Sequence, residues 1–292
     1  KLFLVLAAAA IASGAYAEGY QVNNMSAKQT GMGHVGTAMK LNSESIFFNP
    51  AATAFQTSKF DISAGMTGIL SNVSYRSLPT LENGYQSGAA EKSDNKLSTP
   101  IHVYFNYKPT ERLAVGLGFY TPYGSSMNWG DNWSGAHLVQ EINLTAFTFQ
   151  PTVSYKICDR LSVGAGLTVS WGNFDLSRSL LSPTMRRGLI SGTIDPNITQ
   201  LQRAINSGML TGDALAQATA TLQTLEGAKG YLNSTMNRSL VSAKLQGDSD
   251  VAVGVNAGFL WNITDEWSVG MTWRSRLNMK VAKGHATMNI DP

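Results

Sequence analysis

The glycine-rich run at residues 30–36, TGMGHVG, contains the GxGxxG spacing that cradles a dinucleotide pyrophosphate. That chemistry needs a buried strand before the glycines, a helix opening on them, and an acidic residue about 20 positions later for the ribose. Here residues 22–29 are polar, and residues 54–57, where the acid is expected, are Ala, Phe, Gln and Thr. The run therefore does not predict a nucleotide site, and its glycines need another explanation.

Other reactive side chains give no catalytic pattern. The four histidines, His34, His102, His137 and His285, lack metal-ligand spacing, and the sequence contains neither HExxH nor GxSxG. His102 falls on the polar side of a predicted strand, but no Ser or acid pairs with it by a visible rule. The single Cys158 excludes an intramolecular disulfide. We expect no catalytic residue, no bound metal and no cofactor, and predict that the protein is not an enzyme.

The first residues predict export. Lys1 precedes an apolar run, residues 2–12, and an A-x-A site at residues 15–17, which are the parts of a secretory signal peptide. The run is shorter than the roughly 20 residues that span a bilayer as a helix, and no later segment supplies such a helix. We predict a signal peptide over residues 1–17 and a mature chain from Glu18; without a starting methionine, the sequence is expected to be clipped at its front.

The composition narrows the class of protein. Charged residues make up 14% of the chain, against about 25% in ordinary soluble domains. The formal charge of +3 is small and spread out, so no basic patch predicts a nucleic-acid partner. Apolar and small polar residues are finely interleaved. This combination suits a wall with one face in lipid and one in water.

Period-two alternation runs through the mature chain. It is clear in residues 112–121, 161–172, 251–262 and 267–274, and indicates half-buried strands. A soluble sandwich also alternates, but its outer face carries Lys, Glu and Asp; here the second face carries Gly, Ser, Thr and Asn. The segments also reach the length of a tilted membrane strand. We therefore favour an all-β fold, a transmembrane antiparallel β-barrel. Aromatic residues near strand ends are expected to form its interfacial girdle: Tyr104, Tyr107, Tyr120, Trp171, Trp261 and Trp267.

The connections predict the orientation. We expect seven strands, starting near Phe60, Pro100, Arg112, Asn143, Arg160, Asp250 and Trp267. Short polar turns alternate with long links at residues 77–98, 122–142 and 180–249. Outer-membrane barrels have short periplasmic turns and long outside loops, so the amino terminus is expected on the periplasmic side. Single-chain bacterial barrels close with an even number of strands, and an open edge in lipid leaves backbone groups unpaired. The strands over residues 55–292 therefore predict an incomplete barrel, a fragment that lacks its remaining strands.

Residues 18–54 precede the first strand and lack long alternation. This segment is rich in Gly, Asn and Ser and contains a short hydrophobic run at residues 46–48, IFF. On the periplasmic side, this segment can fold into the barrel lumen as a hatch. Gly31, Gly33 and Gly36 would then allow close backbone packing against the wall and unusual φ values.

These residues resemble the FadL/TodX-type outer-membrane transporters of long-chain fatty acids and other hydrophobic compounds. Residues 19–23, GYQVN, are similar to the start of that family's mature chain, and Ser26 and the three hatch glycines follow with its spacing. Asn49, Pro50 and Ala51 match its NPA motif, and residues 121–124, TPYG, match the end of its third strand. NAG at 256–258 and WRS at 273–275 fit later strands. The resemblance covers the mature chain apart from loops and implies about fourteen strands, of which about half are present.

The resemblance also implies a mechanism. Outside loops capture substrate, a lumenal pocket binds it, a shift of the hatch releases it, and it leaves sideways at a kink in the third strand. The kink is expected near Tyr123 and Gly124, because glycine suits a bend; alternatively, Tyr-Gly simply begins a loop.

Candidate ligands for a carboxylate headgroup are Arg178, Arg274 and Arg276, which alternation places inward. Tyr20 is a further candidate substrate-binding residue. Arg178 occupies the position of a family arginine implicated in headgroup binding, and arginine can pair with a carboxylate through two hydrogen bonds. The alternative is that these arginines line the pore and pair with hatch acids, which we favour for Arg274 and Arg276.

The long insertion, residues 180–249, departs from the usual loop length. Residues 198–232 carry leucines and isoleucines at helical spacing and predict two amphipathic helices broken at Ser207-Gly208. Their apolar faces could form the capture groove or pack on each other. The predicted partners are hydrophobic small molecules, the bilayer and lipopolysaccharide, with a monomer in the outer membrane of a Gram-negative cell. A general porin and a surface adhesin or receptor are the rival functions.

Overall fold

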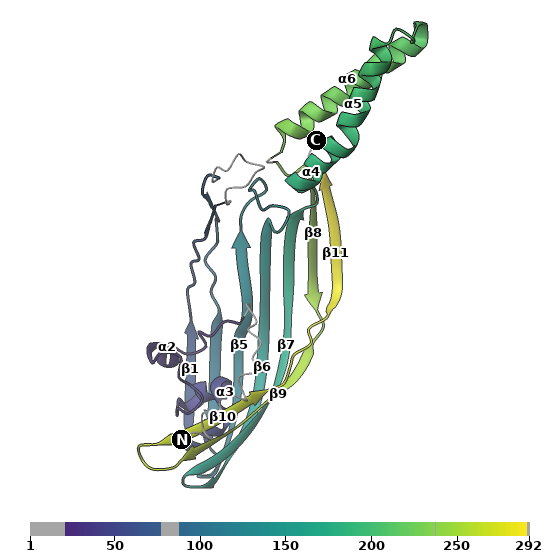
Figure 1. Ribbon diagram of the computed structural model, residues 1–292. Coiled ribbons are helices and arrows are strands. Elements are labelled where there is room, and N and C mark those ends of the chain that lie inside the picture. The colour runs from purple at the N-terminus through teal and green to yellow at the C-terminus, as the bar shows by residue number, and fades with distance from the viewer. Residues whose placement is uncertain (1–20, 77–87, 237, 291–292) are drawn as a thin grey trace, which may run out of the picture.

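The computed structural model describes residues 21–76, 88–236 and 238–290, and leaves the side chain of Ala282 undescribed. The predicted signal peptide, the first residues of the predicted hatch including Tyr20, and part of the first long link lie outside the described residues. The described chain is dominated by one tall antiparallel sheet, with short helices against one face and a helical hairpin beyond its far end (Figure 1).

Nine strands form this sheet. In sheet order, β1 (Phe60–Met66) pairs with β4 (Ile101–Tyr107), and β5 (Leu113–Asn128), β6 (Glu141–Cys158) and β7 (Leu161–Ser179) follow. Both β8 (Val241–Ser249) and β9 (Ala252–Asn262) pair with β7; β10 (Ser268–Arg274) pairs with β9, and β11 (Val281–Ile290) pairs with β8. A separate small sheet joins β2 (Ser74–Tyr75) to β3 (Glu91–Lys92).

The last four strands form two interrupted paths across the sheet. β8 lies against the end of β7 from Asn173 to Ser179, and β9 lies against its beginning from Leu161 to Ser170. β10 and β11 repeat this arrangement on the next path. The sheet therefore has seven strand paths, and β1 and the β10–β11 path form its two edges. It is an open sheet in the part of the chain that the structure describes.

Two predicted boundaries are wrong. The sixth path begins at Val241, well before Asp250, so β8 lies within the predicted insertion, residues 180–249. Similarly, β5 continues to Asn128 and β6 begins at Glu141, which shortens the predicted link at 122–142. At both places the apolar residues change from one face of the sheet to the other, a change described below.

The N-terminal segment, residues 21–56, consists of short helices. They are α2 (Ala27–Gly31), the 3₁₀ turn η1 (Asn42–Glu44), α3 (Ser45–Phe48) and the 3₁₀ turn η2 (Pro50–Phe55). Ser26 caps α2, since its hydroxyl accepts from the backbone N–H of Gln29 at 3.1 Å. Asn49 caps η2 in the same way at Ala51, and Pro50 follows as the first residue of the turn. The NPA motif is thus a helix start.

The predicted helices of the insertion are present. After α4 (Pro183–Leu189) and a π turn, η4 (Ile190–Ile194), α5 (Asp195–Asn206) and α6 (Gly212–Ser234) form an antiparallel hairpin that extends beyond β8 and β11 (Figure 1). Ile194, Ile198, Leu222 and Leu225 pack together. The apolar residues at the base of this hairpin therefore face each other, which is the self-packing alternative. No described helix is both long and apolar enough to cross a membrane.

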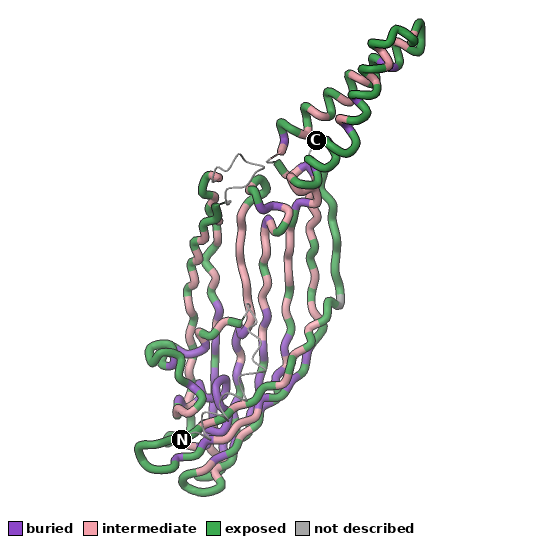
Figure 2. Tube along the Cα trace, in the orientation of Figure 1, coloured by how far each residue is buried: buried purple, intermediate pink, exposed green. Residues whose placement is uncertain are grey.

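Buried residues gather in the lower half of the sheet, where the N-terminal segment covers it (Figure 2). Met25, Ile46, Phe47, Tyr104 and Tyr120 form the largest part of this core. We call the covered face of the sheet inward and the opposite face outward. The end of the sheet beside the helical hairpin is called upper.

Candidate functional site

Polar side chains on the inward face hold the N-terminal segment by its backbone. The Gln150 side chain donates to the carbonyl of Ile46 at 2.9 Å, and Ser162 donates to the carbonyl of Ala51 at 2.8 Å. The hydroxyls of Thr53 and Ser154 lie 2.6 Å apart. Because these groups are buried, each bond satisfies a polar atom that water cannot reach. The small polar face seen in the sequence is therefore a docking surface for this segment.

The N-terminal segment packs closely against the sheet mainly because of glycines in the strands, and less because of those in the TGMGHVG run. A Cβ at Gly164 would lie 2.6 Å from the backbone of Pro50 and Ala51. Within the run, Gly33 has φ +72°, a conformation that favours glycine, and a Cβ at Gly36 would lie 2.6 Å from the Phe48 ring. Gly36 thus packs within its own segment, and nothing in the structure explains Gly31.

The N-terminal segment has two parts with different attachments. Residues 42–56, which we call the anchor, carry most of the buried contacts with the wall. Residues 21–41, which we call the strap, are mostly exposed and cross from the anchor to β5. Asn42, at the junction, has φ +56°.

Glu44 joins these parts to the wall. Its carboxylate is buried, accepts from the hydroxyl of Ser63 on β1 at 2.6 Å, and also accepts from the hydroxyl of Ser26 in the strap. Lys28 lies 3.6 Å away but is largely exposed. Asp61, also on β1, accepts from the backbone N–H of Ser43 at 3.0 Å. These two acids therefore fix the beginning of the anchor, and Glu44 alone also reaches the strap.

The outward face carries an exposed apolar band. Its side chains include Val115, Leu117, Val153, Val163 and Val255, each more than one third exposed. At the upper border, Phe119, Phe147 and Trp171 form an aromatic row with ring centroids 5.9 to 6.4 Å apart. At the lower border, Phe60 stacks on Tyr107 at 4.7 Å, and Tyr155, Trp261 and Trp267 are exposed. The girdle prediction is wrong for Tyr104 and Tyr120. Both side chains lie on the inward face, where Tyr104 is 0% exposed and Tyr120 is 3% exposed.

The height of this band matches a membrane. Trp171 lies ten residues from Leu161, which is the register partner of Trp261. Ten residues of strand extend about 33 Å, or about 25 Å along the normal at a tilt of about 40°. The apolar belt of an outer-membrane barrel is about 25 Å tall.

Above the upper aromatic row, the polar side chains lie on the outward face and the apolar side chains on the inward face. Strand alternation and register place Asn143, Asp175, Lys244 and Gln246 outward. The same alternation places Leu144, Phe174, Leu176 and Leu245 inward. Below the row the inward residues of the same strands are polar, for example Gln150 and Ser170. The inward face above the N-terminal segment is therefore an apolar surface, and the outward face beside it is polar.

The predicted kink region contains a register shift. The pairing of β5 with β6 shifts between Tyr120 and Tyr123, which indicates a bulge at residues 121 and 122. β5 continues as a strand past Gly124, so Tyr-Gly does not begin a loop. The pairing of β5 with β4 ends at Tyr120. Beyond it, the strap takes this edge: Val22 N–H donates to the carbonyl of Pro122 at 2.8 Å, and Gln21 bridges to Tyr123.

The candidate arginines lie in different places. Arg178 is exposed near the upper end of β7, and its alternation with Phe174 and Leu176 places it inward. Arg274 contacts the anchor: its guanidinium lies 4.1 Å from the centroid of the Phe47 ring and donates to the Phe47 carbonyl. This contact is to a ring and a carbonyl, and not to a hatch acid. Arg276 is exposed in the segment between β10 and β11.

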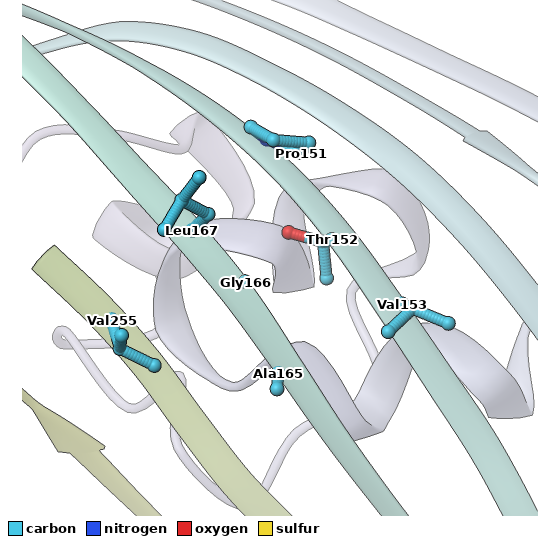
Figure 3. A pocket seen from close by; sticks show the side chains of 7 residues that line it. All are labelled: Pro151, Thr152, Val153, Ala165, Gly166, Leu167 and Val255. Carbon is cyan, nitrogen blue, oxygen red and sulfur yellow. The ribbon is translucent and has the colours of Figure 1, made fainter. Parts of the chain in front are cut away.

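A groove of about 420 Å³ lies on the outward face, between β6, β7 and β9 (Figure 3). Pro151, Val153, Ala165, Leu167 and Val255 line it, and the N-terminal segment lies behind the strands in this view. This groove lies within the outward apolar band. The substrate pocket expected from the sequence lies on the opposite, inward face.

The outward face is an apolar band between two aromatic borders, and the lower inward face is polar and covered by the N-terminal segment. These features are typical of the strands of an outer-membrane protein. Residues 8–291 match the family described as outer membrane protein transport protein (OMPP1/FadL/TodX). The chain belongs to this family, and its place is the outer membrane of a Gram-negative cell. A protein of Neisseria meningitidis serogroup B named as an outer membrane protein is 27% identical over 132 residues, 44% of this chain and 28% of that protein.

Solved structures share the fold. A FadL homologue of Pseudomonas aeruginosa is 17% identical with a TM-score of 0.54 over 89% of this chain and 53% of that one. The toluene transporter TodX of Pseudomonas putida is 16% identical, with a TM-score of 0.52 over 87% and 57%. The toluene transporter TbuX of Ralstonia pickettii is 16% identical, with a TM-score of 0.52 over 85% and 56%. The chain therefore spans little more than half the length of these relatives.

Proposed function

We propose that this chain forms about half the wall of an outer-membrane channel that transports hydrophobic compounds, with long-chain fatty acids as the predicted class. The observation that carries the proposal is the apolar inward surface above the N-terminal segment, which includes Leu144, Phe174 and Leu176. Binding of a hydrophobic ligand is favoured by about 0.8 kcal/mol of free energy for each CH₂ group that is removed from water. Such a surface favours a hydrophobic ligand over an ion or a sugar.

In this proposal further strands close the sheet into a barrel. The open edges, β1 and the β10–β11 path, carry backbone groups that must be paired in lipid. With about fourteen strands in the complete wall, the apolar inward surface becomes the lining of an enclosed binding site. Arg178 lies next to it and would pair with a ligand carboxylate.

The N-terminal segment acts as the hatch of this channel. The anchor, with Asn49, Pro50 and Ala51, stays on the wall, because its buried bonds to Gln150 and Ser162 would all have to break together. The strap, which carries Gly31, Gly33 and Gly36, moves. Tyr20, which precedes the strap and lies outside the described residues, is proposed as a residue that contacts the ligand.

The exit in this proposal lies beside the bulge of β5. The strap supplies the backbone partner of Pro122 and Tyr123 where β4 no longer pairs. Withdrawal of the strap would leave this edge open toward the bilayer, beside Tyr123 and Gly124. A ligand above the anchor could then leave sideways without crossing the buried lower core.

A general porin is the main alternative, and it requires a polar, water-filled lumen. The apolar upper inward face argues against it. A surface adhesin or receptor would use the exposed hairpin α5–α6, which carries the exposed Met209 near its turn. Deleting residues 207–211 would test this role separately from transport. Arg274 and Arg276 serve the wall in our proposal, Arg274 through Phe47.

Uptake tests the proposal directly. Cells that express the full-length protein should take up labelled long-chain fatty acids faster than cells without it, and planar bilayers should show little ion conductance. Deleting residues 18–49 should raise that conductance. Uptake of small sugars with unchanged uptake of fatty acids and aromatic hydrocarbons would instead identify a porin.

A further inference from the structure

We propose that the outward face above the upper aromatic row binds the saccharide headgroup of an outer-leaflet glycolipid. The inference depends on the orientation of the wall in the outer membrane and is independent of the proposed transport. It is carried by a polar cavity of about 490 Å³, within the size range of ligand sites. The cavity lies between the loop after β5 and the upper ends of β6, β7, β8 and β11, and its lining includes Asp131, Asn132, Gln140, Glu141, Ser177 and Lys244.

The height of the cavity selects the kind of lipid. Ser177 lies six residues beyond Trp171 on β7, about 20 Å along the strand and about 15 Å along the membrane normal at the usual tilt. A phospholipid headgroup layer adds only about 5 to 8 Å to each side of the hydrocarbon core. A lipid reaches this cavity only if its headgroup extends through several sugar units.

The lining is already arranged by its own hydrogen bonds. Ser177 donates to the Gln140 side chain at 3.1 Å, and Gln140 donates to the Asp131 carboxylate at 3.3 Å. Lys244 lies 3.1 Å from the Asp175 carboxylate, which also accepts from Gln246 at 2.8 Å. These bonds fix the side chains before a ligand arrives, so less conformational entropy is lost on binding.

Two buried oxygens at this place lack a partner. Within the described ranges, Asp175 Oδ1 and the hydroxyl oxygen of Ser239, which lines the cavity, are closed to solvent and accept or donate no hydrogen bond. Buried polar atoms are nearly always paired. A bound hydroxyl group at the cavity would supply the missing bond to Ser239.

The charge of the lining favours sugars over other groups. Asp131 and Glu141 oppose a bare phosphate, and Lys244 is already paired with Asp175. Among the described residues no cluster of three acidic, His or Cys side chains could hold a metal ion. Ile290 is the one apolar side chain of the lining, too little for an acyl chain. Carboxylates, amides and hydroxyls together match the mixed donors and acceptors of sugar hydroxyl groups.

Binding of rough-type lipopolysaccharide to the purified full-length protein in detergent tests the site. Lys244→Met and Glu141→Ala should each weaken binding about tenfold, the loss expected for one hydrogen bond to a charged group. Asn143→Ala, an outward change two residues from Glu141 and outside the cavity, should leave it unchanged. The delipidated core oligosaccharide at millimolar concentration should compete with the glycolipid for the wild-type protein.

The proposal is overturned if core oligosaccharide fails to compete, or if both cavity variants bind lipopolysaccharide as the wild type does. It is also overturned if phosphatidylglycerol, which has no sugar, binds equally well with the same sensitivity to the variants. Heat-dependent gel mobility checks that each variant is folded. Uptake of hydrophobic compounds by Glu141→Ala cells should equal that of the wild type, so failure of the transport proposal would be seen separately.

Discussion

The side-chain amide of Asn49 donates to the backbone carbonyl of Phe259, 2.9 Å away and 210 residues later in the chain. The same amide donates to the carbonyl of Thr37 at 2.7 Å, and its oxygen accepts from the N–H of Ala51. One buried side chain therefore joins the strap, the start of η2 and the sixth strand path. Gly258 leaves the space that it occupies, because a Cβ there would collide with the Asn49 side chain.

Asn49→Leu should release the N-terminal segment from the wall. The change leaves two buried carbonyls and one N–H without partners, at about 1–3 kcal/mol for each. We expect limited proteolysis to remove residues 21–56 at least tenfold faster than in the wild type. Asn173→Ala, at an exposed position of β7, is the control, and equal cleavage rates of the two variants would contradict this role.

Glu44→Ala should loosen the strap and leave the anchor in place. Ser26 and Ser63 lose their buried acceptor, while Asp61 still holds Ser43. In a Cys158→Ser background, a cysteine placed at Val22 should react with a thiol reagent several times faster when Glu44 is absent. Lys28→Ala should change this rate less than Glu44→Ala does, because the Lys28 side chain is largely exposed and its ammonium lies 3.6 Å from the Glu44 carboxylate. Equal rates for Glu44→Ala and the parent would show that Glu44 does not hold the strap.

Gly124→Trp should block uptake of hydrophobic compounds. An added Cβ at Gly124 meets the Leu144 carbonyl at 3.4 Å and Val22 at 3.8 Å, which are ordinary contacts. Gly124→Ala should therefore fold and transport normally, whereas an indole ring would fill the edge beside the strap. Unchanged uptake by a correctly inserted Gly124→Trp protein would rule out a sideways exit at this place.

Leu144→Asn should weaken binding of a hydrophobic ligand about tenfold or more, because a buried Leu side chain contributes about 1.5–3 kcal/mol. The matched control is Asn143→Leu, which changes the adjacent outward position. Quenching of a fluorescent fatty acid by the purified full-length protein measures both. If the two variants bind equally, the apolar inward face is not the ligand surface.

Arg178→Leu should weaken binding of a fatty acid about tenfold and leave a neutral hydrocarbon of similar size unaffected. A hydrogen bond to a charged group contributes about 1.5–3 kcal/mol, and arginine can make two to one carboxylate. Arg178→Lys should keep part of the affinity. An equal loss for the neutral ligand would indicate that Arg178 acts through the shape of the site.

Much of the wall could be predicted from alternation alone. The outward apolar band, the seven strand paths and the helical break near Ser207 are local patterns, and each is present in the structure. The missed signal was also in the sequence. In β6 the apolar residues change from even positions, Ile142 and Leu144, to odd positions, Phe147 and Phe149, and this change of phase marks the upper aromatic row. Because alternation in a single phase stops at this change, it predicts an end near residue 121 for the third strand and a start near Asp250 for the sixth, whereas β5 continues to Asn128 and β8 begins at Val241.

The sequence by itself determined which residues of each strand share a face, because a period of two follows from the pleat of a single strand. It could not determine what covers each face. Only the tertiary structure placed Tyr104 and Tyr120 against the anchor, Arg274 on Phe47, and Val22 beside Pro122. Those contacts join segments more than 50 residues apart and depend on how the whole sheet curves around the N-terminal segment, which no local pattern specifies.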